Sequence, residues 1–133
     1  MSELSERERI LIVDDEPANL KVMREVLGND YRLSFAKSGE LALQLIKNEP
    51  PRLILLDVMM PDMNGFEVCE ILKSTPETAH IPIIFVTALS HEQDESEGFA
   101  LGAVDYITKP ISPAIVRARV KTHLSLVQAQ QLQ

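Results

Sequence analysis

Five short apolar runs alternate with helical patterns along this chain, and the alternation restricts the fold more than any other feature. The runs are Ile10–Val13, Tyr31–Ala36, Leu53–Leu56, Ile83–Thr87 and Val104–Ile107. A brief aliphatic run bounded by turn residues is typical of a strand that is buried on both faces. Strands that alternate with helices predict an α/β protein with a parallel sheet.

Helix signals lie between these runs at regular places. Apolar residues recur at Leu20, Met23 and Leu27, and Gly28 follows as a stop signal. Further helices are predicted after Ser38-Gly39, after Asn64-Gly65, near His91–Leu101 and after Ser112-Pro113. We therefore predict a (βα)5 doubly wound, flavodoxin-like sandwich with a five-stranded parallel sheet in the order 2-1-3-4-5.

The size and charge of the chain narrow its class. Its 133 residues predict one domain, which we place at residues 9–125, between an extension (1–8) and a helical tail or linker (126–133). The net charge of −7 argues against direct binding to nucleic acid or to an anionic membrane surface. No apolar run approaches the roughly 20 residues of a spanning helix, and the start MSELSERER lacks the apolar core of a secretory signal. We predict a cytoplasmic location, and a buried role for the single cysteine, Cys69.

Acidic residues end two of the predicted strands. Asp14 and Asp15 follow the first strand, and Asp57 follows the third. In the predicted order these strands are neighbours, so the three carboxylates converge at the carboxyl edge of the sheet. Crowded carboxylates repel unless a cation shares the site, and Mg²⁺ prefers such oxygen ligands. Taken singly, each aspartate is equally compatible with a turn or a helix cap.

A hydroxyl and a cation reach the same edge. Thr87 ends the fourth strand, and Lys109 follows the fifth. A lone threonine is usually an ordinary strand residue, and a lone lysine is usually a solvated charge. Together with three acids they favour a site for a phosphoryl group carried on a carboxylate. In this interpretation Asp57 ends its strand because it is the residue to be modified.

The motifs resemble those of a known family. They are V-D-D-E-P (13–17), L-D-V-M-M-P-D-M-N-G (56–65), V-T-A (86–88), G-A-V-D-Y (102–106) and T-K-P (108–110). In this order and spacing, the set resembles the receiver domain of a two-component response regulator, from about residue 9 to residue 125. The resemblance implies that Asp57 is the phosphoacceptor and that Mg²⁺ is the cofactor. It also implies the metal ligands, which are Asp14, Asp15, Asp57 and the backbone carbonyl of Met59.

The resemblance implies three further roles. Thr87 is similar to the switch hydroxyl of the family, and Tyr106 is similar to the aromatic residue that moves inward with it. Lys109 is similar to the lysine that pairs with the phosphoryl group, and a cis peptide bond is expected between Lys109 and Pro110. The expected function is signalling: the domain receives a phosphoryl group and switches a face made by the fourth helix, fifth strand and fifth helix.

The resemblance also implies partners. A sensor histidine kinase or a histidine phosphotransfer protein donates the phosphoryl group near the first helix, where Met23 and Leu27 lie. An output domain after Gln133 or a separate partner carries the signal onward, and the style of residues 98–120 resembles receivers joined to cyclic di-GMP enzymes or kinases. The fourth helix is acidic and the fifth is basic, which fits either two solvated faces or a homodimer whose copies pair through opposite charges. The residues concerned are Glu92, Asp94, Glu95, Glu97, Arg117, Arg119 and Lys121.

Three alternatives use the same fold. An enzyme with a phospho-aspartate intermediate is expected to carry its second acid two positions after the first and to have a capping insertion, whereas Asp14 and Asp15 are adjacent and the connections are short. A nucleotide or flavin binder needs a phosphate loop rich in glycine, serine or threonine, which Glu16–Asn19 does not offer. A docking module that is never phosphorylated is the third. We expect no enzyme activity beyond self-catalysed phosphoryl transfer to Asp57 and its later hydrolysis.

Overall fold

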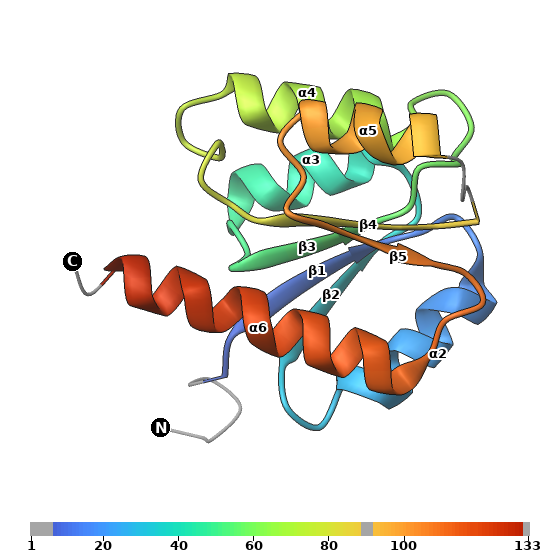
Figure 1. Cartoon of the computed structure of the whole chain (residues 1–133), viewed down its shortest axis with the longest axis vertical. Coiled ribbons are helices and arrows are strands. Elements are labelled where there is room, and N and C mark those ends of the chain that lie inside the picture. Colours follow the sequence, from blue (N-terminus) through green and yellow to red (C-terminus); the bar gives the residue numbers. More distant parts are fainter. Residues whose placement is uncertain (1–6, 89–91, 132–133) are drawn as a thin grey trace.

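The predicted sheet is present in full. The computed structural model describes residues 7–88 and 92–131, and its five strands are all parallel, in the order β2-β1-β3-β4-β5 (Figure 1). This confirms the predicted fold class and strand order. The strands are β1 (Arg9–Val13), β2 (Arg32–Ala36), β3 (Leu53–Leu56), β4 (Ile83–Thr87) and β5 (Asp105–Thr108).

Helices cover both faces of the sheet. Figure 1 shows α2 and α6 on one face and α3, α4 and α5 on the other. The elements are α2 (Pro17–Leu27), α3 (Gly39–Asn48), α4 (Gly65–Ser74), α5 (Glu92–Ala100) and α6 (Pro113–Gln131). Each face therefore has its own apolar core, one against α2 and α6 and one mainly against α3 and α4.

Complete burial explains the uninterrupted apolar runs. Every residue of β3 and β4 is buried, because each strand is covered by helices on both faces. Burying one Leu or Ile side chain contributes roughly 1.5–3 kcal/mol, so these runs supply much of the driving force for folding. The buried Cys69 also packs in the core beneath α4, as predicted.

The first helix packs its apolar stripe inward. Met23 is 2% exposed and Leu27 is fully buried, both in the core beneath α2. These two side chains hold α2 on the sheet, so they offer no contact surface to a phosphohistidine protein. A partner that docks near this helix would have to contact its exposed residues instead.

Side chains cap two of the predicted helix starts. The Ser38 side chain accepts a hydrogen bond from the Leu41 N–H at the start of α3. Asn64 and Glu67 form a reciprocal capping box at the start of α4. Because these caps end the loops after β2 and β3, they fix where each helix begins relative to the sheet.

Several predictions lie outside the described residues or stay untested. His91 and the tail residues 132–133 lie outside them, and so do the side chains of Glu92, Asp94 and Glu95. The boundary predicted between residues 125 and 126 falls inside α6 and stays a prediction. Within residues 7–88 and 92–131, no helix is both long enough and apolar enough to cross a membrane.

Lys73 stabilises the loop that leads into β4. Its ammonium group donates hydrogen bonds to the carbonyls of Ala79 (2.9 Å) and Ile81 (2.8 Å). We expect Lys73→Met to lower the free energy of unfolding by about 2 kcal/mol, because the substitution leaves these carbonyls without their charged donor. Urea denaturation measures the change, with Lys21→Met at an exposed position of α2 as the control. Equal effects of the two substitutions would contradict this role.

Candidate functional site

The three predicted aspartates meet at the carboxyl edge of the sheet. The Asp57 N–H donates to the Val13 carbonyl (2.9 Å), which continues the β1–β3 pairing and places Asp57 beside the end of β1. Carboxylate oxygens of Asp14, Asp15 and Asp57 all lie within 4.8 Å of one another. Asp14 and Asp57 are only 4% and 2% exposed, so two of the three acids are withdrawn from water.

Lys109 bridges the two buried aspartates. Its Nζ lies 2.9 Å from Asp14 Oδ2 and 3.3 Å from Asp57 Oδ2. The backbone N–H of Lys109 donates to the Thr87 carbonyl (2.9 Å), so the pairing of β4 and β5 sets the position from which the side chain reaches inward. Burial lowers the pKa of Lys109, but its contacts with Asp14 and Asp57 outweigh burial and leave that pKa raised.

Asp57 is strongly perturbed. Burial, followed by the nearby Asp14 charge, raises the pKa of Asp57 to about 6, although Lys109 and the Met59 N–H act in the opposite direction. The Met59 N–H donates to Asp57 Oδ1 (3.2 Å). The positive charge of Lys109 therefore does not fully compensate the negative charges of the clustered aspartates. A further cation at the site would be electrostatically favourable.

The donor set suits Mg²⁺. The ligands on offer are carboxylate oxygens, which this ion prefers together with water and phosphate oxygens. The raised pKa of Asp57 is consistent with this fit, because it comes first from burial and then from the nearby Asp14 charge, and a bound cation would oppose both effects. The residues at this edge therefore fit a magnesium ion, although exposed acidic groups alone would not indicate one.

A tight loop carries Asp57 to the start of α4. The Gly65 N–H donates to the Val58 carbonyl (2.9 Å), which folds the chain back against Asp57. A Cβ atom at Gly65 would lie 2.2 Å from the Asp57 carbonyl oxygen, so only glycine permits this approach. Asp62 in the same loop has a φ of 69°, a conformation that Asp tolerates better than most residues.

Thr87 and Tyr106 lie between this edge and the face of α5. Thr87 is fully buried at the end of β4, and Tyr106 is 7% exposed on β5. The Tyr106 ring packs near Phe85 (centroids 5.7 Å apart) and Phe99 (6.3 Å apart). The aromatic ring is thus already inward in this structure. The peptide bond between Lys109 and Pro110 is cis.

The family model of the response regulator receiver domain matches residues 10–121. The chain belongs to this family. It is 49% identical over 115 residues to a probable cyclic di-GMP phosphodiesterase of Vibrio cholerae, covering 86% of this chain and 26% of that protein. It is 45% identical over 121 residues to the transcriptional regulatory protein YvrH of Bacillus subtilis, covering 90% of this chain and 50% of that protein.

A solved structure agrees with this assignment. A putative response regulator from Chloroflexus aurantiacus superposes with a TM-score of 0.86 at 35% identity, covering 90% of this chain and 99% of the other. The receiver domain spans about a quarter to a half of the two curated relatives above. Their names describe different outputs, so the receiver is the part that they share with this chain.

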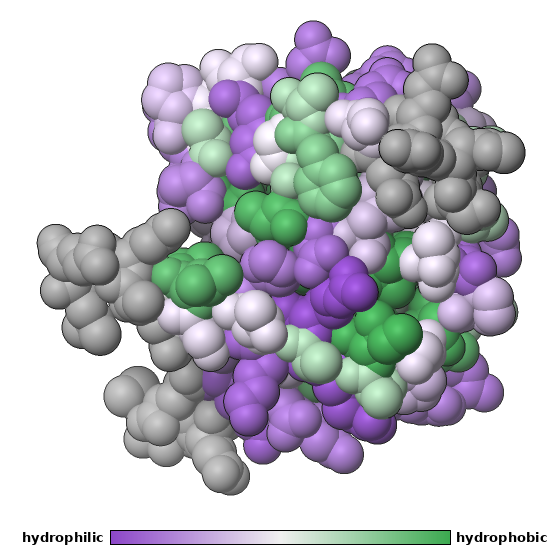
Figure 2. Space-filling view, viewed as in Figure 1, coloured by the Kyte–Doolittle hydropathy of each residue, from purple (hydrophilic) through white to green (hydrophobic). Residues whose placement is uncertain are grey.

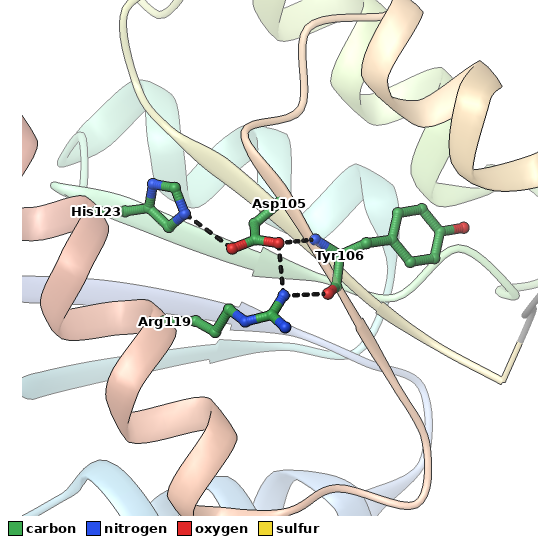
Figure 3. Close-up of polar contacts among 4 residues, drawn as sticks. All are labelled: Asp105, Tyr106, Arg119 and His123. Carbon is green, nitrogen blue, oxygen red and sulfur yellow. Dashed lines mark hydrogen bonds and ion pairs between the residues drawn. The ribbon is translucent and has the colours of Figure 1, made fainter.

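Sequence reasoning missed one polar cluster of the receiver. Asp105 on β5 accepts a hydrogen bond from Arg119 Nη1 (2.6 Å) and lies 3.0 Å from His123 Nε2, both on α6 (Figure 3). Arg119 had been predicted either to face solvent or to pair with a second copy, and His123 had no predicted role. The structure gives both residues partners within the domain, and the predicted pairing of Arg119 with a second copy stays a prediction. Their spacing of four residues on one helix was the available signal.

The raised pKa of Asp57 predicts a pH effect on stability. Its pKa rises from an ordinary value of 3.8 to about 6, so between these values the folded receiver holds a proton that the unfolded chain has lost. The contribution of Asp57 to the free energy of unfolding is therefore greatest below pH 4. This contribution is lost as the pH rises toward 6. At about 1.4 kcal/mol per unit, the full effect approaches about 3 kcal/mol.

This effect can be isolated by comparing wild type with Asp57→Asn without divalent ions. We expect the variant to be more stable at pH 7.5 by about 2–3 kcal/mol, and the difference to shrink toward pH 4. Urea denaturation at both pH values gives the comparison. A difference that is the same at both values would show that Asp57 is not perturbed in the folded protein.

Proposed function

We propose that Asp57 is the residue of this receiver that accepts the phosphoryl group. The contact of Lys109 Nζ with Asp57 Oδ2 is the observation that carries this assignment. It places a fixed cation beside the Asp57 carboxylate, where the negatively charged oxygens of an incoming phosphoryl group would lie. Asp62, by contrast, is exposed in the loop, and the part of the chain that the structure describes forms no ion pair with it.

The reaction is an exchange of one bond for another. A carboxylate oxygen of Asp57 attacks the phosphorus of a phosphohistidine, the P–O bond forms and the P–N bond breaks. The imidazole leaves with the electron pair and takes up a proton. A magnesium ion held by Asp14, Asp15, Asp57 and the Met59 carbonyl would neutralise phosphoryl charge. Lys109 and the Thr87 hydroxyl bind the transferred oxygens.

The signal then passes to the face of α5 and β5. Thr87 ends β4, next to β5, which carries Tyr106. New acceptor oxygens on Asp57 attract the Thr87 hydroxyl and shift the balance between two arrangements of Tyr106 and its neighbours. The buried position of Tyr106 near Phe85 and Phe99 supports this route, because any shift of the ring must repack α5.

The proposed partners follow from this cycle. A sensor histidine kinase or a histidine phosphotransfer protein supplies the phosphoryl group in the cytoplasm. The output is a domain joined after Gln133 or a separate protein, and the similarity to the Vibrio cholerae protein supports an enzyme of cyclic di-GMP turnover as one such output. The receiver itself turns over no external substrate. Its chemistry ends when water hydrolyses the acyl phosphate.

A homodimer through α5, β5 and α6 is part of the proposal. Figure 2 views this face, where hydrophobic side chains interrupt the hydrophilic surface. Phe99, Val104 and Ile115 are 48%, 40% and 45% exposed. Because Arg119 is bound within the domain, these apolar residues would supply the contact. Sedimentation velocity with and without an acyl-phosphate mimic tests it, and unchanged association in a Val104→Asp variant would contradict it.

Intact mass measurement tests the assignment of function. The receiver is incubated with a small phosphoryl donor, with and without Mg²⁺. We expect one phosphoryl group to be added, and only when Mg²⁺ is present. A folded receiver that gains no mass under either condition would instead be a docking module.

A further inference from the structure

The cluster of Asp105, Arg119 and His123 joins β5 to α6 and also binds the backbone of Tyr106. Tyr106 N–H donates to Asp105 Oδ1 (2.8 Å), and Arg119 Nη1 donates to the Tyr106 carbonyl (2.9 Å). Figure 3 shows the Tyr106 ring directed away from this cluster. We call the three residues the β5–α6 clasp. β5 lies at the edge of the sheet, and the clasp binds both the N–H and the carbonyl of Tyr106 on this strand.

Charge holds the clasp together. Burial raises the pKa of Asp105, but hydrogen bonds from His123 and the Tyr106 N–H, together with the Arg119 charge, leave that pKa lowered. Asp105 thus stays ionised while it accepts from three donors. Arg119 and His123 lie four residues apart, so both reach the same carboxylate from one face of α6.

The clasp and the phosphoacceptor site are attached to opposite ends of one short strand. β5 contains only Asp105–Thr108. Asp105 begins the strand and is tied to α6, whereas Lys109 follows the strand and is tied to Asp57 and Asp14. A displacement of Lys109 along the strand axis is therefore passed to Asp105 across four residues that are hydrogen-bonded as a unit to β4.

α6 extends this connection across the domain. It begins at Pro113, four residues after Lys109, and runs past the opposite edge of the sheet (Figure 1). Nineteen residues of helix span about 28 Å. Its inner face is an apolar stripe of Val116, Val120 and Leu124. Apolar packing is not directional and permits small shifts, whereas the clasp bonds specify one position of α6 along β5.

We propose that Asp105, Arg119 and His123 are positioning residues that couple the Lys109 end of β5 to α6. Through them, occupancy of Asp57 and the position of α6 change together. The proposal rests on the proposed role of Asp57 and deepens it by naming the contact through which its state leaves the domain. Coupling is reciprocal, so loosening the clasp also changes how tightly the site holds a phosphoryl-like ligand.

The test compares Arg119→Gln with Arg117→Gln. Arg117 lies two residues away on α6, is exposed, and undergoes the same chemical change. Hydrogen exchange of α6 amides is measured with Mg²⁺ alone and with Mg²⁺ and beryllofluoride, a mimic of the acyl phosphate. The affinity for beryllofluoride is measured in parallel, and intact mass after treatment with a phosphoryl donor reports whether Asp57 still reacts.

We expect wild type and Arg117→Gln to change α6 exchange on binding beryllofluoride. In Arg119→Gln that change is lost and the affinity shifts by on the order of fivefold, while Asp57 still takes up a phosphoryl group. Equal responses in the two variants would overturn the coupling. So would a wild-type α6 that does not respond although the site is phosphorylated. Failure of phosphorylation in wild type would refute the role of Asp57, and the coupling with it.

A second pair covers the case in which Arg119→Gln does not fold. His123→Gln retains an N–H donor toward Asp105, whereas His123→Ala removes it. We expect His123→Gln to keep the response of α6 and His123→Ala to weaken it. A purely structural role would lower the stability of the alanine variant without changing the response to beryllofluoride, which would exclude the proposed coupling.

Discussion

Asp57→Asn is expected to abolish phosphoryl uptake by this receiver completely. Asparagine retains the size and hydrogen-bonding oxygen of Asp57, but its amide is not a nucleophile at phosphorus. Lys109 stays in place because Asp14 still binds it, at 2.9 Å. Intact mass after incubation with a small phosphoryl donor and Mg²⁺ therefore shows a single unmodified species.

Asp62→Asn is the matched control for this loss. Asp62 lies in the same loop, is exposed, and has a positive φ that asparagine also tolerates. We expect this variant to gain one phosphoryl group at the wild-type rate. Phosphoryl uptake by Asp57→Asn, or its loss in Asp62→Asn, would show that Asp57 is not the acceptor.

Gly65→Ala is expected to damage both stability and chemistry. The new Cβ would meet the Asp57 carbonyl oxygen at 2.2 Å and the Val58 Cα at 2.9 Å, so the loop must move away from α4. Such overpacking costs about 1–3 kcal/mol. A displacement of Asp57 relative to Lys109 by about an ångström slows phosphoryl uptake by roughly tenfold to a hundredfold. Urea denaturation and the rate of mass increase measure the two effects.

Ser74→Ala, at the exposed end of the same helix, separates a local clash from a general effect on α4. Exposed substitutions of this kind change stability by about 0.5 kcal/mol or less. We expect its phosphoryl uptake to match that of wild type. If Gly65→Ala reacted as fast as Ser74→Ala, the close approach at Gly65 would not be what positions Asp57.

Asp57→Asn and Gly65→Ala illustrate which parts of the site can be predicted from the sequence alone. The aspartates, Thr87 and Lys109 were predictable because each ends or follows a buried strand, and the carboxyl ends of parallel strands share one edge. The apolar runs of β1, β3 and β4 were equally clear, since burial on both faces confines polar residues to the strand ends, at Arg9 in β1 and Thr87 in β4. Gly65 could be placed in a loop, but its 2.2 Å approach to Asp57 depends on coordinates.

Side-chain partners were the part that sequence patterns could not assign. Met23 and Leu27 are placed on α2 by their spacing, yet only packing shows that both face the core. Arg119 belongs to a run of basic residues that looks solvated, and its bond to Asp105 depends on how α6 lies across β5. The raised pKa of Asp57 likewise depends on burial and on the distance to Asp14.

The sequence by itself determined the (βα)5 fold, the strand order and the edge where the site lies, because these follow from local periodicity and from chain topology. Only the tertiary structure decided which charges are joined. Lys109 bridges Asp14 and Asp57, and Arg119 and His123 bind Asp105. The physical reason is that charge–charge contacts form between residues distant in the chain, and their strength depends on ångström distances and burial that periodicity does not encode.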